Sequence, residues 1–146
     1  MKRVLFICIH NSARSQMAEA LLNNLYPKDY IAYSAGIEPA ERVNAYVVKA
    51  LAEIGIDISK NRPKSLDEFN GWDFDYVVTV CEEGKENCPF FPGGKEYLHK
   101  SFPDPASLRG SEEEIMEKVR EIREEIRKWL IETFSQNIGG GIELRL

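Results

Sequence analysis

The chain has 146 residues, of which 43% are hydrophobic and 29% charged, and its formal net charge is −5. This size and composition predict a single globular domain over residues 1–146 and exclude a disordered or fibrous protein. The negative net charge argues against nucleic acid or an anionic membrane as a partner, and no apolar run is long enough to span a bilayer. Any anion that binds must therefore be held by local donors.

The first third of the chain alternates between apolar runs and a helical pattern. Arg3–Ile9 is rich in Val, Ile and Phe without polar alternation, which is typical of a central parallel strand covered on both faces. Ser15–Leu25 places its apolar side chains on one helical stripe and ends before Pro27. Tyr30–Ala35 predicts a second strand.

The middle of the chain predicts one helix and two further strands. Val43–Ile54 has a helical pattern with Ile54 among its inward side chains, and Gly55 stands where a C-terminal capping glycine belongs. Tyr76–Val80 predicts a buried third strand, and Glu96–His99 a short fourth one.

The last long element is a helix from Ser111 to Phe134. Ser111 and Glu114 have the spacing of a capping box. The helix also carries a regular inward stripe of apolar residues, namely Ile115, Val119, Ile122, Ile126 and Leu130. The alternation of strands and helices predicts an α/β fold of three layers, with a four-stranded parallel sheet flanked by helices. The tail, 137–146, is expected to be mobile or to add an edge strand.

The cysteines indicate a cytoplasmic setting. Three widely spaced cysteines do not form the paired framework of a secreted protein, and the apolar run near the N-terminus is too short for a signal peptide. We therefore expect reduced thiols, which are candidates for metal ligands, nucleophiles or redox groups.

The loop after the first strand carries the most informative pattern. The strand ends at Cys8, five residues precede Arg14, and a helix follows at once. A loop that curls into a helix N-terminus directs successive backbone N–H groups at one point and so binds a tetrahedral oxyanion. Arg14 adds a planar fork for two oxygens, and the same donors stabilise a thiolate at Cys8. The predicted oxyanion-binding loop is Ile9, His10, Asn11, Ser12, Ala13 and Arg14.

Ser15, which follows the loop, and His10, which belongs to it, are expected to differ in importance for the chemistry. Ser15 offers one more hydrogen bond to the Cys8 sulfur. His10 has no necessary role beside a thiolate, and we expect it to face the solvent. A Cys8 that was only a core residue would leave Arg14 and the polar loop unexplained.

Two later segments lie at the ends of the third and fourth strands. Asp104 is either a general acid that protonates a leaving oxygen or an ordinary Asp-Pro turn, and the sequence favours neither. Cys81 ends the third strand at the same edge of the sheet as Cys8, and Cys88 follows seven residues later. If the intervening piece is helical, the two Cα atoms are about 10 Å apart, so a disulfide would require it to unwind. A zinc ligand pair or two unrelated thiols are the alternatives.

Several motifs in order along the chain resemble the thioredoxin-coupled arsenate reductases, relatives of the low-molecular-weight protein tyrosine phosphatases. The resemblance runs from Val4 to about Leu130. Besides the Cys8–Arg14 loop it rests on Ser34-Ala35-Gly36-Ile37-Glu38, Ile56-Asp57-Ile58-Ser59, Val78-Thr79-Val80-Cys81, Asn87-Cys88-Pro89 and Asp104-Pro105-Ala106.

What the resemblance implies is a relay of three thiols. Cys8 attacks arsenate while Arg14 holds its oxygens and Asp104 assists the departure of water. Cys81 then attacks Cys8 and releases arsenite. Cys88 attacks Cys81, which leaves an outward-flipped disulfide that a thioredoxin-like protein reduces. Phosphate and sulfate are expected to compete with arsenate, and no bound cofactor is required.

Some relatives bind potassium beside the loop. Asn11, Glu19 and Ser34 match part of that site, whereas the region that should supply the other ligands, Asn61–Asp67, does not align. Potassium is therefore an expectation that rests on three residues only.

Two other functions are compatible with parts of the pattern. A phosphotyrosine phosphatase would share the loop and Asp104, but such enzymes typically carry an aromatic residue where this chain has Ala106, and they have no use for Cys81 and Cys88. A non-catalytic thiol sensor for arsenite or zinc would use the three cysteines but would not need Arg14.

Overall fold

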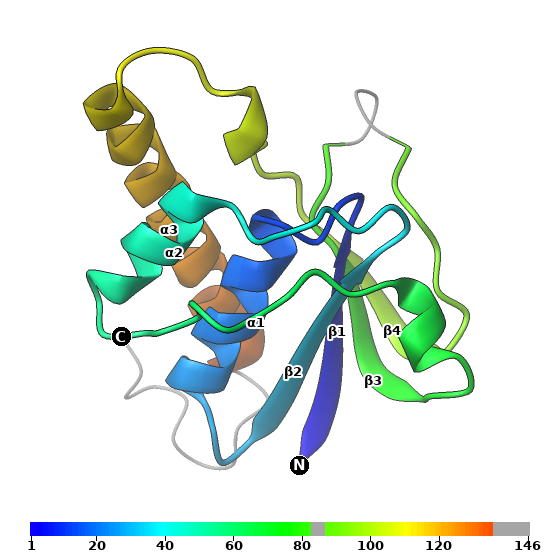
Figure 1. Ribbon diagram of the computed structural model, residues 1–146. Helices are drawn as coiled ribbons and strands as arrows, with labels where there is room; N and C mark the ends of the chain where they lie inside the picture. The colour runs from blue at the N-terminus through cyan, green and yellow to red at the C-terminus, as the bar shows by residue number, and fades with distance from the viewer. Residues whose placement is uncertain (83–86, 136–146) are drawn as a thin grey trace.

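The computed structural model describes residues 1–82 and 87–135 and contains a parallel sheet in the order β2-β1-β3-β4 (Figure 1). The four strands are β1 (Lys2–Cys8), β2 (Tyr30–Gly36), β3 (Phe74–Thr79) and β4 (Gly94–His99). The helices are α1 (Arg14–Leu25), α2 (Ala45–Ala52) and α3 (Glu112–Phe134), with short 3-10 turns η1 (Leu66–Phe69) and η2 (Pro105–Ser107). The predicted α/β fold with four parallel strands is confirmed.

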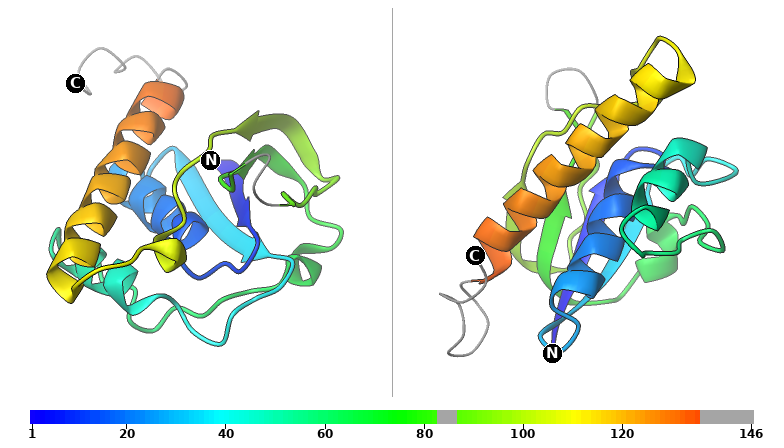
Figure 2. Two further views of the ribbon diagram at one scale, coloured as in Figure 1. Left: turned by 90° about the horizontal axis from the view of Figure 1, so that it is seen from above. Right: turned by 90° about the vertical axis from the view of Figure 1, so that its left-hand side faces the viewer.

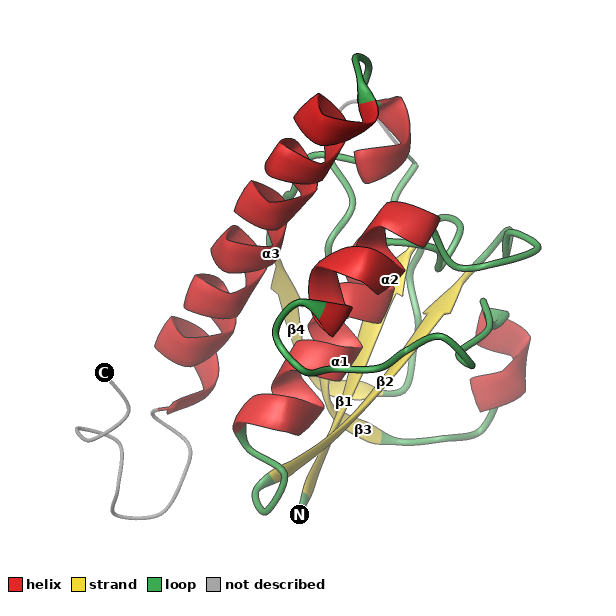
Figure 3. Cartoon of the chain, turned by 60° about the vertical axis from the view of Figure 1, so that its left-hand side comes forward, coloured by secondary structure: helices red, strands yellow, loops and turns green. Residues whose placement is uncertain are grey.

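The two faces of the sheet are covered differently. The three α-helices lie together on one face, with α1 and α3 side by side (Figures 2 and 3). On the other face, Phe69 of η1 and Phe91 pack against the buried side chains of Leu5, Ile7 and Val77. In the described part of the chain this second outer layer consists of a 3-10 turn and loops rather than an α-helix.

The central strand β1 sets the position of the site. It pairs with β2 on one side and β3 on the other, and its residues from Val4 to Ile7 are fully buried because the helices cover one face and the η1 layer covers the other. Ile7 is level with both Ala35 and Thr79, so the carboxyl ends of the three strands meet at one edge. Each fully buried aliphatic side chain contributes about 1.5–3 kcal/mol, which makes β1 a rigid base for the loop that follows it.

The helix α2 is shorter than its sequence pattern predicts. The side chain of Asn44 accepts hydrogen bonds from the N–H groups of Tyr46 and Val47 and so begins the helix. The helix ends at Ala52, which leaves Ile54 outside it and 40% exposed. The predicted inward position of Ile54 is therefore wrong. Gly55 follows with φ +83°, a conformation that favours glycine.

The helix α3 begins with the predicted capping box. Glu114 N–H donates to Ser111 Oγ at 3.1 Å, and Ser111 N–H donates to Glu114 Oε1 at 3.0 Å. Of the predicted stripe, Val119, Ile122, Ile126 and Leu130 are buried, whereas Ile115 is partly buried. No helix in the described ranges is long and apolar enough to cross a membrane. The predicted tail, 137–146, lies outside those ranges, so the extent of the domain stays a prediction.

Candidate active site

The loop between β1 and α1 turns its carbonyl groups outward and its amides inward. Three of its carbonyl oxygens accept hydrogen bonds, at 2.8–3.0 Å, from backbone N–H groups of the segment after β2: Ile9 from Glu38, His10 from Ala40 and Ser12 from Asn44. Because a trans peptide is planar, an outward carbonyl turns the N–H of the next residue to the opposite side. Asn11 shows the result, since its N–H donates to Cys8 Sγ at 3.3 Å.

Two backbone features allow this tight loop. Asn11 has φ +50°, a left-handed conformation that asparagine tolerates better than most residues. Gly36, at the end of β2, presses against the loop so closely that a Cβ there would lie 2.5 Å from the Ile9 carbonyl oxygen. A side chain at position 36 would therefore displace the loop.

The side chain of Asn11 directs the hydroxyl of Ser15 toward the sulfur. Asn11 Oδ1 accepts from the Lys64 backbone N–H at 2.8 Å and from Gln16 Nε2 at 3.0 Å, which fixes the orientation of the amide. Its Nδ2 then donates to Ser15 Oγ at 2.8 Å. Ser15 Oγ lies 2.8 Å from Cys8 Sγ, and because it already accepts from Asn11, its own proton is available to the sulfur. Two hydrogen-bond donors are thus directed at the buried Cys8 sulfur.

Arg14 and Asp104 close the other side of the site. Arg14 is buried, and its Nη1 donates to the Phe102 carbonyl oxygen at 3.2 Å. Its Nη2 lies 3.8 Å from Asp104 Oδ2. The other carboxylate oxygen of Asp104 accepts the N–H of Ala106 at 2.9 Å and caps η2. Asp104 therefore makes the turn and also faces the arginine, and its role as a general acid stays a prediction. Its side chain is 29% exposed, which leaves it open to proton exchange with solvent.

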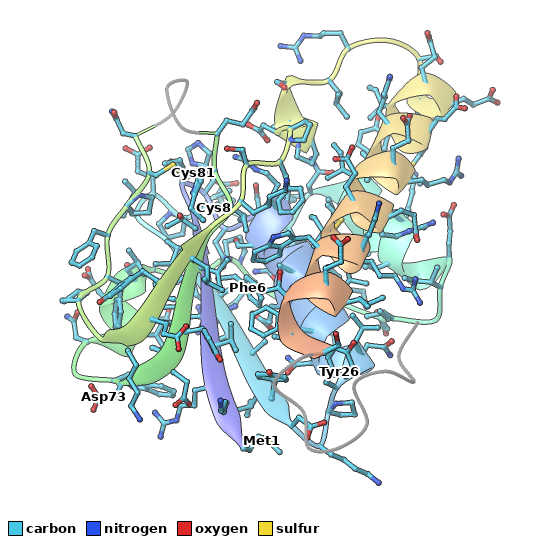
Figure 4. All side chains as sticks on the ribbon, turned by 180° about the vertical axis from the view of Figure 1, so that it is seen from behind. Met1, Phe6, Cys8, Tyr26, Asp73 and Cys81 are labelled. Carbon is cyan, nitrogen blue, oxygen red and sulfur yellow. A yellow bond between two sulfur atoms is a disulfide. The ribbon has the colours of Figure 1, made fainter. Side chains whose placement is uncertain are left out.

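Cys81 and Cys88 form a disulfide with a Cα–Cα distance of 5.9 Å, and Cys8 is a free thiol. Figure 4 shows Cys8 and Cys81 at the same end of the sheet, as the parallel pairing of β1 and β3 requires. Cys81 is fully buried, whereas Cys88 is partly exposed. The expected outward flip of the whole disulfide is therefore wrong for Cys81, because the adjacent Val80 N–H is bound to the carbonyl of Ile7.

His10 is exposed, as predicted, but its ring also makes a contact with the backbone. Its Nδ1 lies 2.9 Å from the carbonyl oxygen of Glu38, and since a carbonyl only accepts, that nitrogen carries the proton. The ring therefore connects the oxyanion loop to the segment after β2.

The unwinding expected between Cys81 and Cys88 concerns residues 83–86, which lie outside the described ranges.

The three residues expected to bind potassium do come together, but their surroundings do not suit a cation. Ser34 Oγ donates to Glu19 Oε1 at 2.5 Å. The Lys64 ammonium lies 3.6 Å from that carboxylate oxygen and 3.5 Å from Ser34 Oγ. Asn11 Oδ1 already accepts two hydrogen bonds. The positive charge of Lys64 thus neutralises Glu19 and lies where a potassium ion would bind.

Four residues that support the site were not identified from the sequence. They are Gln16, Gly36, Lys64 and Phe102. Lys64 and Phe102 act through a backbone N–H and a backbone carbonyl, which any residue type could supply. Gly36 belongs to the Ser34–Glu38 motif, where a glycine at the end of a predicted strand was the available signal. Gln16 lies in the first turn of the predicted helix, and its residue type alone does not indicate a supporting role.

Comparisons with known proteins agree with this geometry. The sequence profile of the low molecular weight phosphotyrosine protein phosphatases matches residues 3–138. The chain belongs to that family. An arsenate reductase from Halalkalibacterium halodurans is 42% identical over 135 residues, covering 92% of this chain and 96% of its own length.

Solved structures of the same family include two informative neighbours. The arsenate reductase from Archaeoglobus fulgidus is 43% identical, with a TM-score of 0.70 over 87% of this chain and 98% of that one. A thioredoxin-dependent arsenate reductase from Corynebacterium glutamicum is 36% identical, with a TM-score of 0.60 over 88% of this chain and 60% of that one. The suspected relationship to arsenate reductases is thereby confirmed.

Proposed function

We propose that this protein reduces arsenate to arsenite through a relay of three thiols, with electrons supplied by a thioredoxin-like protein in the cytoplasm. The observation that carries the proposal is the Cys81–Cys88 disulfide beside a free Cys8 at the base of an oxyanion loop. A phosphatase needs the loop but not the disulfide. The similarity to proteins named arsenate reductases supports the same conclusion.

The first step is attack of the Cys8 thiolate on arsenic. The inward amides of the loop and the Arg14 guanidinium bind the arsenate oxygens and stabilise charge as the bond forms. One arsenate oxygen leaves as water, and Asp104, which lies next to Arg14, supplies its proton.

The second step is the redox step. The Cys81 thiolate attacks Cys8 Sγ, the sulfur–arsenic bond breaks, and its electron pair stays on arsenic, which leaves as arsenite. Arsenic is reduced from the +5 to the +3 state, and the two sulfurs are oxidised to a Cys8–Cys81 disulfide. Cys88 then attacks Cys81 Sγ and frees Cys8 as a thiolate. The Cys81–Cys88 disulfide in the structure corresponds to the product of this last exchange.

The test is arsenite production from arsenate with thioredoxin, thioredoxin reductase and NADPH. We expect sustained turnover by the wild type. Cys88→Ser should yield at most one equivalent of arsenite, because the oxidation would remain in a buried Cys8–Cys81 disulfide. No arsenite from either protein would exclude the reductase and leave the phosphatase.

The phosphatase remains the second candidate, because the family description and the oxyanion loop both apply to it. Ala106 gives no aromatic surface for a phenyl ring next to Asp104. We therefore expect only slow hydrolysis of an aryl phosphate, with phosphate and sulfate acting as competing oxyanions.

A further inference from the structure

The disulfide is bordered by an unusually exposed pair of aromatic side chains. Phe90, two residues after Cys88, is 71% exposed, more than any other aromatic residue in the described ranges. It stacks on Tyr97 of β4, which is 45% exposed, with ring centroids 5.3 Å apart and an interplanar angle of 25°. We call this pair the aromatic platform.

Contacts between Tyr97 and Gly94 hold the aromatic platform in place. The N–H of Gly94 donates to the Tyr97 hydroxyl at 3.0 Å. A Cβ at position 94 would lie 3.1 Å from the Tyr97 ring and 2.7 Å from a Val77 methyl group, so glycine makes room for the ring. Tyr97 is thus fixed on the edge strand and presents Phe90 to the solvent. An exposed aromatic group that is already ordered loses little entropy when it is covered by a partner.

The surroundings of the aromatic platform suit an apolar partner surface. Residues 87–94 read Asn-Cys-Pro-Phe-Phe-Pro-Gly-Gly, an uncharged run in a chain that is 29% charged. Asn87, next to Cys88, lines a depression whose other residues include the exposed Ile37 and one acidic residue, Glu38. Cys88, which is partly exposed, therefore lies near the start of an uncharged segment that runs to Gly94.

We propose that the aromatic platform is the docking surface for the dithiol protein that reduces the Cys81–Cys88 disulfide. This inference rests on the proposed function, because it names a contact for the partner of that same relay. A partner thiolate must reach Cys88 Sγ, since Cys81 is fully buried, and any protein that does so covers the residues beside Cys88. The partner that fits has an uncharged, apolar surface around its reactive thiol.

The partner thiolate attacks Cys88 Sγ, the Cys81–Cys88 bond breaks, and Cys81 leaves as a thiolate. The second thiol of the partner, once deprotonated, attacks the mixed disulfide and releases Cys88 as a thiolate. The partner ends as a disulfide, and the two cysteines are reduced.

The experiment compares Phe90→Ala with Ile54→Ala, which removes another exposed apolar side chain from the turn after α2. Arsenate turnover is measured while thioredoxin is varied at constant thioredoxin reductase. We expect Phe90→Ala to raise the KM for thioredoxin about tenfold, equal to about 1.4 kcal/mol, as for an interface anchor. Ile54→Ala should leave that KM unchanged. Turnover driven by dithiothreitol, which needs no docking surface, should stay within twofold in both variants.

Single-turnover arsenite formation by the pre-reduced wild type, without any reductant, tests the relay by itself. No arsenite in that assay refutes the proposed function, whereas arsenite together with an unchanged thioredoxin KM in Phe90→Ala refutes only the docking surface. An equal loss with thioredoxin and dithiothreitol also refutes it, because the platform would then act on the relay itself. Loss of a wild-type dimer in Phe90→Ala, at unchanged thioredoxin KM, would assign the platform to self-association instead.

Discussion

The hydrogen bonds that link Asn11, Ser15 and Cys8 make a quantitative prediction. Ser15→Ala removes one of the two donors to the Cys8 sulfur. A hydrogen bond to a charged group contributes about 1.5–3 kcal/mol. If all of that loss reaches the transition state for attack on arsenate, kcat/KM falls about 10- to 150-fold.

Asn11→Gly tests whether the side-chain amide of Asn11 acts on the Cys8 sulfur through the hydroxyl of Ser15. Glycine accepts the left-handed backbone at this position, so the loop can keep its path while the side chain is lost. The Ser15 hydroxyl then loses the donor that orients it, and Lys64 N–H loses its acceptor. We expect Asn11→Gly to lower kcat/KM in the wild-type background and to have little further effect in Ser15→Ala.

The assay is the rate of arsenite formation in single turnover, which avoids any contribution from the reducing partner. Thermal melts of the four proteins of this double-mutant cycle show whether each variant is folded at the assay temperature. Ser15→Ala within twofold of wild type would show that the sulfur does not depend on the hydroxyl. Fully additive effects would show that Asn11 acts on the loop and not through Ser15.

Three further outcomes follow from other contacts. Gly36→Ala should lower the melting temperature and weaken inhibition by phosphate, because its Cβ would lie 2.5 Å from the Ile9 carbonyl oxygen; unchanged melting and inhibition would contradict this. The hydrogen bond from Arg120, aided by Arg123, lowers the pKa of Glu53 to about 2, so its stabilisation is complete above pH 4.5 and is lost as the pH falls toward 2. Since Glu53 is partly solvent-screened, Glu53→Gln should cost about 1 kcal/mol at pH 7 and clearly less at pH 3 in thermal melts, and an equal cost at both would refute the assignment. Potassium and sodium chloride should support equal activity in the wild type, whereas Lys64→Ala should respond to potassium; a potassium-dependent wild type would show that Lys64 does not replace the ion.

Elements with strong local signals were predicted well. The capping box of α3 and the buried run of β1 depend on residues close together in the chain, so composition and spacing identify them. The end of α2 was placed too late because Ile54 continues the apolar pattern while the backbone turns at Gly55. There the turn outweighed the apolar pattern in deciding where the helix ends.

The candidate site was predictable only for its local part. Cys8, Arg14 and Ser15 belong to one strand, loop and helix, and their spacing indicates an oxyanion site. The contact from Lys64 to Asn11 joins residues 53 positions apart and uses a backbone N–H, so no pattern of side chains in the sequence predicts it. The ammonium group of the same residue lies beside Glu19, and this pairing of distant residues likewise has no signature in the sequence.

The burial of the three cysteines explains why a relay needs a third thiol. Cys8 and Cys81 are both buried: Cys8 is the last residue of β1, and Cys81 lies two residues beyond the end of β3. A disulfide between them would lie in the interior, where a partner protein could not bring a thiolate in line with the sulfur–sulfur bond. Cys88 is partly exposed and is already bonded to Cys81 across a Cα–Cα distance of 5.9 Å. It carries the oxidation from a site that must exclude water to a surface that a second protein can reach, and the rigid oxyanion loop does not have to open between turnovers.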